Sequence, residues 1–168
     1  KYFIFLTSKN QTEMTDLSKK YQNKTPLELL RDKPAMFIGS IDNDIRPNWV
    51  FNKKTNRMEY KSDLTYPHGL LHIFLEILMN AVDQSKRVSN LTYIKVSIED
   101  NIIIVENNGD GIDVAINEKM GIYYPEMLFS VFASSSNYNE DETRTVVGTH
   151  GIGAKATVVF SKEFKVET

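Results

Sequence analysis

The chain has 168 residues, 41% of them hydrophobic, which is enough to bury a single core and predicts one folded domain. Its formal net charge of −2 gives no overall electrostatic reason for it to hold DNA or an anionic membrane by itself. The absence of cysteine excludes disulfides and thiolate metal sites. No apolar run approaches the roughly 20 residues of a membrane span, so we expect no membrane partner.

An N-terminal arm and a first helix open the chain. Residues 1–24 are mostly polar after a short apolar start and are expected to form an extended arm, leaving 25–168 as the folded domain. Thr25 followed by Pro26 predicts a helix start, because threonine caps helix N-termini and proline favours the first helical position. Pro34 should end that helix.

The remaining elements are predicted from hydrophobic periodicity and from turn residues. A period of 3.6 residues indicates a helix, whereas alternation of apolar and polar residues indicates a half-buried strand. These patterns predict a turn at Gly39-Ser40, a hairpin of 49–51 with 58–60, a central helix over 70–87, strands at 93–98 and 102–105, a short helix at 125–132, a helix starting at Ala154 and a strand at 164–167.

The central helix is apolar around most of its circumference and carries one polar seam. His72, Glu76, Asn80, Asp83 and Arg87 follow one another at spacings of three or four residues, so they lie along one edge. The apolar stripe consists of Leu70, Leu71, Phe74, Ile77, Leu78 and Ala81. The seam can be the solvated face of an amphipathic helix. Alternatively, a carboxylate with an amide oxygen one turn further on suits a hard cation and a water molecule.

Two glycine-rich loops follow. In the first, Asn107 stands at a strand end, and Gly109 and Gly111 allow a sharp turn and close approach to a ligand. An ordinary Asn-Gly turn is the alternative. The second loop, 148–155 (GTHGIGAK), opens a helix whose N-terminal N–H groups favour anions, with a flexible hinge as the alternative. It is neither a Walker A loop, since Ala154 separates the last glycine from the lysine, nor a Rossmann fingerprint.

With these motifs in this order, the chain resembles the GHKL ATPases, which share the Bergerat nucleotide-binding fold. It is most similar to the N-terminal ATPase region of eukaryotic-type and viral type II DNA topoisomerases. The segments that carry the resemblance are 21–25, 37–40, 76–83, 107–111, 124–125, 135–138, 148–155 and 160–168.

The resemblance implies a role for each matching residue. Glu76 matches the general base that polarises the attacking water, and Asn80 matches the ligand of Mg²⁺. Asn107 matches the residue that reads the adenine amino group, and Lys155 belongs to the loop that cradles the phosphates. The implied nucleotide-binding set is Asn80, Asp83, Arg87, Asn107, Gly109, Gly111, Ser135, Ser136, Asn137, Gly148, Gly151, Ile152, Gly153, Ala154 and Lys155, with Glu76 as the catalytic residue and Asn80 as the metal ligand.

The implied fold is α/β in two layers, a mixed and mostly antiparallel sheet with helices on one face. The implied cofactors are ATP and Mg²⁺, and the implied function is the ATP-operated gate of a type II DNA topoisomerase. A homodimer is expected in the full-length protein, with Tyr21 on an arm that crosses to the other protomer and duplex DNA bound through other domains. The expected location is the nucleus, or a viral replication site. The alternatives are another GHKL machine, namely a chaperone or mismatch-repair clamp, and a nucleotide-binding module without turnover.

The sequence also departs from the family pattern. Leu75 replaces an acidic residue before the base, Gln84 replaces an asparagine, and Thr149-His150 replace an Arg-Asn pair. The base and the metal ligand are retained, so an ATPase is still expected. The chain is expected to be a fragment that lacks the following transducer domain, which supplies a lysine to the γ-phosphate. Weak or no turnover by the chain alone is therefore predicted.

Overall fold

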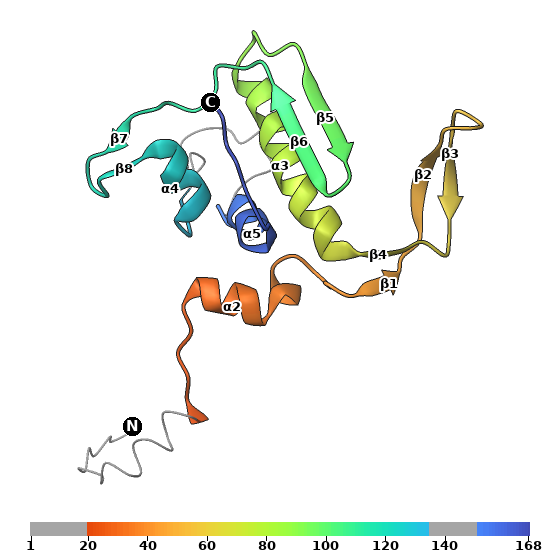
Figure 1. Cartoon of the computed structure of the whole chain (residues 1–168), viewed down its shortest axis with the longest axis horizontal. Coiled ribbons are helices and arrows are strands. Elements are labelled where there is room, and N and C mark those ends of the chain that lie inside the picture. Colours follow the sequence, from red (N-terminus) through yellow and green to blue (C-terminus); the bar gives the residue numbers. More distant parts are fainter. Residues whose placement is uncertain (1–19, 135–150) are drawn as a thin grey trace, which may run out of the picture.

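The computed structural model describes residues 20–134 and 151–168, and Figure 1 shows how their elements are arranged. The helices are α2 (Pro26–Asp32), the 3₁₀ helix η1 (Pro34–Met36), α3 (His68–Arg87), α4 (Tyr124–Ser130) and α5 (Gly153–Phe160). The strands are β1 (Asn43–Ile45), β2 (Asn48–Asn52), β3 (Arg57–Lys61), β4 (Thr65–Pro67), β5 (Ile94–Glu99), β6 (Ile102–Asn107), β7 (Ile116–Asn117) and β8 (Ile122–Tyr123).

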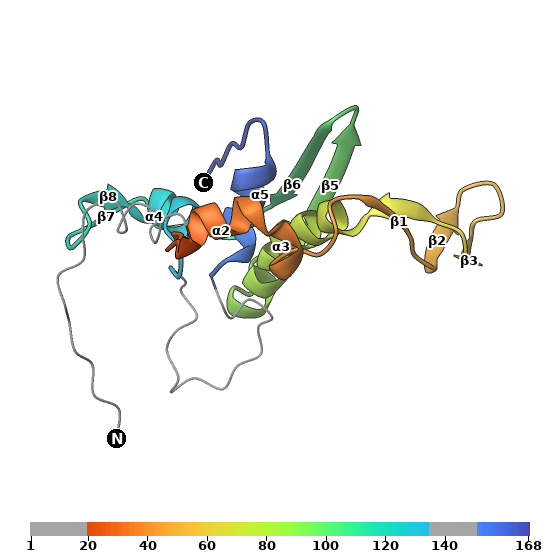
Figure 2. The same cartoon turned by 90° about the horizontal axis from the view of Figure 1, so that it is seen from below.

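The described strands form four separate antiparallel pairs, β1–β4, β2–β3, β5–β6 and β7–β8. The predicted α/β class with antiparallel strands is confirmed, whereas no continuous sheet joins the pairs within the described residues. The β2–β3 hairpin lies between β1 and β4 in sequence. These two pairs therefore follow one another along a single arm that projects from the helices (Figures 1 and 2).

Helix α3 is the centre of the fold. It contacts the β6 strand and also α5, and α5 in turn contacts α4. Figure 1 shows α3 running beside the β5–β6 hairpin with α5 next to it. The core cluster consists of Leu30, Ile38, Ile73 and Ala156, with Phe37, Phe132, Val159 and Phe160 packed against it. This core joins α2, α3 and α5, so it fixes α5 against the middle of α3.

The helix and turn signals of the sequence act as predicted. The Thr25 hydroxyl accepts a hydrogen bond from the backbone N–H of Glu28 (3.3 Å), and the Glu28 carboxylate accepts one from the N–H of Thr25 (2.8 Å). This capping box satisfies two donors that α2 would otherwise leave exposed. Gly39 has φ 85° and Asp100 has φ 50°, the left-handed conformations that turn residues of these types tolerate.

One predicted element is absent, and one residue of the predicted apolar stripe is exposed. Residues 164–167 form no strand, since Phe164 packs against Phe129 (ring centroids 5.4 Å apart) and no described strand pairs with the segment. Only Phe164 of this segment is packed, because Val166 is 38% exposed. On α3, Leu70 is 55% exposed whereas Ile73, which lies outside the predicted stripe, is buried. The reason is that α5 covers the face of α3 that carries Ile73.

None of the described helices is long and apolar enough to span a membrane.

Candidate functional site

The Glu76 side chain lies against the first residue of α5. A Cβ added at Gly153 would overlap the Glu76 carboxylate and would stand 2.7 Å from Glu76 Cγ. Glycine is therefore the residue that allows this approach. The sequence places Glu76 and Gly153 in separate motifs, and the structure brings them into contact. The carboxylate consequently stands at the N-terminus of a helix.

The polar seam of α3 is only partly exposed. His72 Nε2 and Glu76 Oε1 are 3.0 Å apart, a hydrogen bond across one helical turn. Both side chains are about one-third exposed. Asn80 and Arg87 are exposed, whereas Asp83 is buried with 6% exposure. The predicted seam therefore has an accessible edge at Glu76 and Asn80 and a buried member at Asp83.

Lys155 lies in the first turn of α5 and is almost fully buried, with 3% exposure. Its Nζ donates a hydrogen bond to the backbone carbonyl of Ser134 (2.6 Å). Burial lowers the pKa of Lys155 to about 8, because the charged ammonium loses hydration. A buried cation beside a helix N-terminus is an arrangement that an anion would stabilise.

A glycine sets the backbone conformation before α5, and a threonine within α5 bonds the helix to α3. Gly151 has φ 60°, a left-handed conformation that sets the direction in which the chain enters the helix. Ile152 makes no side-chain cap, so the first N–H groups of α5 have no side-chain acceptor from it. Thr157 Oγ1 donates to the Ile73 carbonyl of α3 (2.9 Å) and lies 3.2 Å from the Gly153 carbonyl. This contact fixes α5 against the helix that carries Glu76.

The NNGDG loop after β6 is folded back onto the end of α3. Asn107 Oδ1 accepts the N–H of Gly109 (3.0 Å), which closes the turn. Asn108 Oδ1 accepts the N–H groups of Thr92 and Tyr93 (3.0 and 3.1 Å). A Cβ at Gly109 would stand 3.1 Å from both Asn107 Oδ1 and Leu91 Cδ1. The loop is thus closely packed, which accounts for glycine at this position.

The second glycine of that loop meets the end of the described chain. Gly111 has φ 76°, and a Cβ there would stand 2.5 Å from Thr168 Oγ1. The same hydroxyl accepts the N–H of Ile112 (2.5 Å) and lies 3.2 Å from the Ile112 carbonyl. The contact of Thr168 with Ile112 was not predicted, because the two residues are distant in sequence.

The structure thus brings together part of the predicted site. Glu76 contacts Gly153 at the start of α5, and Lys155 lies two residues further along the same helix. Asn107, Gly109 and Gly111 belong to the loop that follows β6. Sequence reasoning did not identify Ser134, Thr157 or Thr168 as contributors, since each forms its contact with a residue distant in sequence: Ser134 through its backbone carbonyl, and the two threonines through hydroxyl groups that bond to backbone atoms. The predicted residues Ser135, Ser136, Asn137 and Gly148, and the departures Thr149 and His150, lie outside the described residues.

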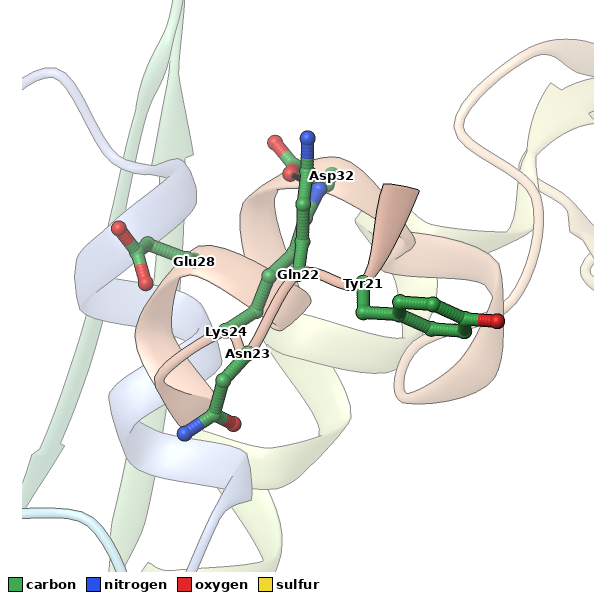
Figure 3. A pocket seen from close by; sticks show the side chains of 6 residues that line it. All are labelled: Tyr21, Gln22, Asn23, Lys24, Glu28 and Asp32. Atoms are coloured by element: carbon green, nitrogen blue, oxygen red, sulfur yellow. Dashed lines mark hydrogen bonds and ion pairs between the residues drawn. The ribbon is translucent and has the colours of Figure 1, made fainter. Parts of the chain in front are cut away.

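A surface hollow lies where residues 21–24 meet α2, away from the residues of the candidate site. It is lined by Tyr21, Gln22, Asn23, Lys24, Glu28 and Asp32. Figure 3 shows the Tyr21 ring pointing away from the other five side chains. Tyr21 is 69% exposed. None of the seam residues lines this hollow, so it is not part of the candidate site.

Residues 65–164 match the family of histidine kinase-, DNA gyrase B- and HSP90-like ATPases. This range includes α3, the β5–β6 hairpin and α5. The chain belongs to this ATPase family. The matched range contains Glu76, Asn107 and Lys155. The family assignment therefore identifies the contact between α3 and α5 as part of a nucleotide-binding domain.

Individual relatives of this ATPase-family chain are DNA topoisomerases. The DNA topoisomerase 2 of Acanthamoeba polyphaga mimivirus is 38% identical over 167 residues, covering 96% of this chain and 13% of the relative. The crystal structure of the ATPase region of Saccharomyces cerevisiae topoisomerase II superposes with a TM-score of 0.83 at 38% identity, over 86% of this chain and 39% of that chain. The ATPase and transducer domains of DNA topoisomerase II from Balamuthia mandrillaris give a TM-score of 0.82 at 39% identity, over 86% and 37%.

The donor set of this ATPase domain suits a metal ion held mainly by a nucleotide. Among the described residues, no group of three or more His, Asp or Glu side chains is placed to hold a metal ion. Asn80 offers one exposed amide oxygen, one turn from Glu76. Mg²⁺ is commonly held by one or two protein oxygens together with substrate phosphates and water. The residues present therefore fit Mg²⁺ that arrives with phosphates.

Proposed function

We propose that this chain is the ATP-binding and ATP-hydrolysing gate domain of a type II DNA topoisomerase. The observation that carries the proposal is the contact of the Glu76 carboxylate with Gly153 at the start of α5, with Lys155 in the first turn of the same helix. The contact brings the Glu76 carboxylate, the proposed base, next to a helix N-terminus that we propose binds anions. In a member of this ATPase family, that arrangement suits attack of water on a terminal phosphate.

In this proposal, each described residue acts through a group that the structure shows. Glu76 accepts a proton from the attacking water, and His72 holds its carboxylate by the 3.0 Å hydrogen bond. Asn107 Oδ1 accepts the Gly109 N–H and keeps a second lone pair that can accept from the adenine amino group. The N–H groups at the start of α5 and the Lys155 ammonium bind the phosphates.

Asn80 is the proposed ligand of Mg²⁺, which would neutralise phosphate charge when bound. Arg87 lies exposed near the C-terminal end of the same helix, where it is proposed to contribute positive charge to the nucleotide site. Asp83 is also proposed as a member of the nucleotide-binding set, although its burial means that it acts from beneath the accessible edge. Ser135, Ser136, Asn137 and Gly148 complete the proposed set.

The wider activity is proposed from the relatives. These are named DNA topoisomerase 2, and the chain spans 13% of the mimivirus relative. We infer a full-length homodimer that closes on ATP binding while one DNA duplex passes through another, with the Tyr21 arm crossing to the other protomer. The location inferred with this activity is the nucleus or a viral replication site. Decatenation of linked DNA circles by the full-length protein tests this inference, and its absence would favour a chaperone or repair clamp.

Glu76→Gln tests the proposed chemistry. Removing the base should reduce hydrolysis by about 100-fold or more while ATP binding is retained, since the amide is isosteric but accepts no proton. Hydrolysis is measured in single turnover with protein in excess, so that a slow rate is still resolved. Unchanged hydrolysis would exclude Glu76 as the base. Because weak or no turnover is expected of this chain alone, hydrolysis is compared in the full-length protein and its Glu76→Gln variant. Binding without hydrolysis in both full-length proteins would favour a nucleotide-binding module without turnover.

A further inference from the structure

Positive charge is concentrated on the projecting β2–β3 hairpin. Residues 46–61 contain five basic residues and one acidic residue, a net charge of +4. The whole chain carries −2, so the remaining 152 residues carry −6. The net charge of the whole chain is therefore the sum of a basic hairpin segment and an acidic remainder.

The turn of this hairpin has a fixed shape. Asn52 Oδ1 accepts the N–H groups of Lys54 (2.9 Å) and Thr55 (3.4 Å), and Asn52 Nδ2 donates to Glu59 Oε1 (2.7 Å). Thr55 Oγ1 donates to the same Glu59 oxygen (3.0 Å). These hydrogen bonds hold the pKa of Glu59 below its ordinary value. The one carboxylate of the hairpin is thus occupied internally.

The remaining charges at the turn are uncompensated. Lys53, Lys54 and Arg57 are exposed, and no carboxylate among the described residues forms an ion pair with them. Lys61, by contrast, lies 3.5 Å from Glu59. Three cations without partners at a prearranged turn form an electrostatic site for a polyanion.

The base of the hairpin is anchored so that the turn is held away from the body. The Arg46 N–H donates to the Leu64 carbonyl (2.7 Å), which continues the β1–β4 ladder. Asn48 Nδ2 donates to the Tyr66 hydroxyl (3.3 Å). Figures 1 and 2 show the hairpin as the part of the described chain that extends furthest beyond α3 on that side. A large ligand can therefore reach the turn without meeting the helices.

The two faces of the hairpin differ in character. Arg57, Glu59 and Lys61 alternate with Met58 and Tyr60, so the charged residues share one face. The other face carries Trp49, Phe51, Met58 and Tyr60, all more than half exposed. The ligand of the turn is inferred from charge complementarity. Lysine and arginine side chains that form no ion pair attract phosphates more strongly than an apolar protein surface.

We propose that the basic turn, defined as Lys53, Lys54 and Arg57, binds the phosphate backbone of a DNA duplex. A two-stranded antiparallel ribbon has dimensions that duplex grooves accept, and lysine and arginine at its end contact phosphates irrespective of sequence. The choice of duplex DNA rests on the proposed topoisomerase function. The proposal adds a contact point for DNA on the ATPase domain itself.

The test measures binding of a short fluorescent duplex to the 168-residue chain by anisotropy over a series of salt concentrations. For the unmodified chain, the logarithm of the binding constant should fall linearly with the logarithm of the salt concentration. Replacing Lys53, Lys54 and Arg57 by Ala should reduce the magnitude of this slope by about three. Replacing all three by Glu should weaken binding by about tenfold or more at low salt. The matched control replaces Lys95, Lys119 and Lys162 by Glu, three exposed lysines outside the hairpin that give the same change in net charge.

Equal losses in the hairpin and control variants would overturn the proposal, and so would failure of the unmodified chain to bind the duplex at about 50 mM salt. Trp49, the single tryptophan of the chain, reports locally because it lies on the hairpin and is 59% exposed. Its emission should change little on adding duplex, because Trp49 lies on the apolar face, opposite the charged residues. A change that instead follows protein concentration without DNA would identify a second copy of the chain as the ligand and contradict the proposal.

An ATP analogue titrated into the same variants separates this proposal from the proposed function. Retained nucleotide binding with lost duplex binding supports the basic turn as a distinct contact. Duplex binding by a chain that neither binds nor hydrolyses ATP would leave the hairpin proposal standing while the gate function fails. Nucleotide binding without duplex binding would overturn the hairpin proposal and leave the gate function standing.

Discussion

The Glu76 carboxylate occupies the space in which a side chain at Gly153 would begin. These residues are 77 positions apart in the sequence, and their contact joins the middle of α3 to the start of α5. The glycine therefore has a steric role in addition to its role in the loop. It allows the proposed base to stand beside the N–H groups that are proposed to bind phosphate.

Gly153→Ala tests this relationship. The added methyl group must displace the Glu76 side chain, so we expect a loss of stability of about 1–3 kcal/mol and a loss of hydrolysis. Urea denaturation and single-turnover hydrolysis measure the two effects. The double variant Gly153→Ala with Glu76→Ala should recover stability, because it removes the displaced carboxylate. Additive losses in the double variant would contradict the steric account.

His72→Ala tests whether His72 positions Glu76. Loss of the 3.0 Å hydrogen bond should lower the hydrolysis rate by about tenfold, or about 1.4 kcal/mol, because the carboxylate then samples other rotamers. Binding of an ATP analogue should be unchanged, and His72→Gln should restore part of the rate by supplying a donor. Leu75→Ala, one residue before the base, serves as the control. A proportional loss of binding and rate would indicate a structural role only.

The buried Lys155 predicts a dependence of stability on pH. Its pKa falls to about 8 in the folded protein, below the ordinary value of about 10.5, so folding disfavours the charged form. The cost is fully present below about pH 8 and is relieved as pH rises toward about 10.5, where both states are neutral. The free energy of unfolding should therefore rise by on the order of 3 kcal/mol over that interval relative to Lys155→Met. A parallel pH profile in the two proteins would show that Lys155 is not responsible.

Much of the local structure was predictable because it depends on neighbours in sequence. Thr25 caps α2 as the Thr-Pro start predicted, and the two strands predicted at 93–98 and 102–105 form the β5–β6 hairpin. Strong periodicity likewise located α3 to within two residues at its start. In each of these cases the decisive interaction spans a few residues.

Features that depend on packing between distant segments were not predictable. Asp83 belongs to the seam by helical spacing, yet it is buried, since periodicity describes a face and not what covers it. The alternation around Phe164 is typical of a strand, but the segment has no partner strand among the described residues, and only Phe164 of its apolar residues is packed. Lys155 was expected to meet phosphate, but its hydrogen bond to the Ser134 carbonyl could not be read from sequence.

The most direct test of the account is calorimetric titration of the chain with a non-hydrolysable ATP analogue, with and without Mg²⁺, alongside Asn80→Ala. We expect binding that Mg²⁺ strengthens and that Asn80→Ala weakens by about tenfold only when Mg²⁺ is present. Asn101→Ala, which removes an exposed asparagine in the β5–β6 turn, is the matched control and should bind normally. Binding that neither Mg²⁺ nor Asn80→Ala alters would contradict the proposed site.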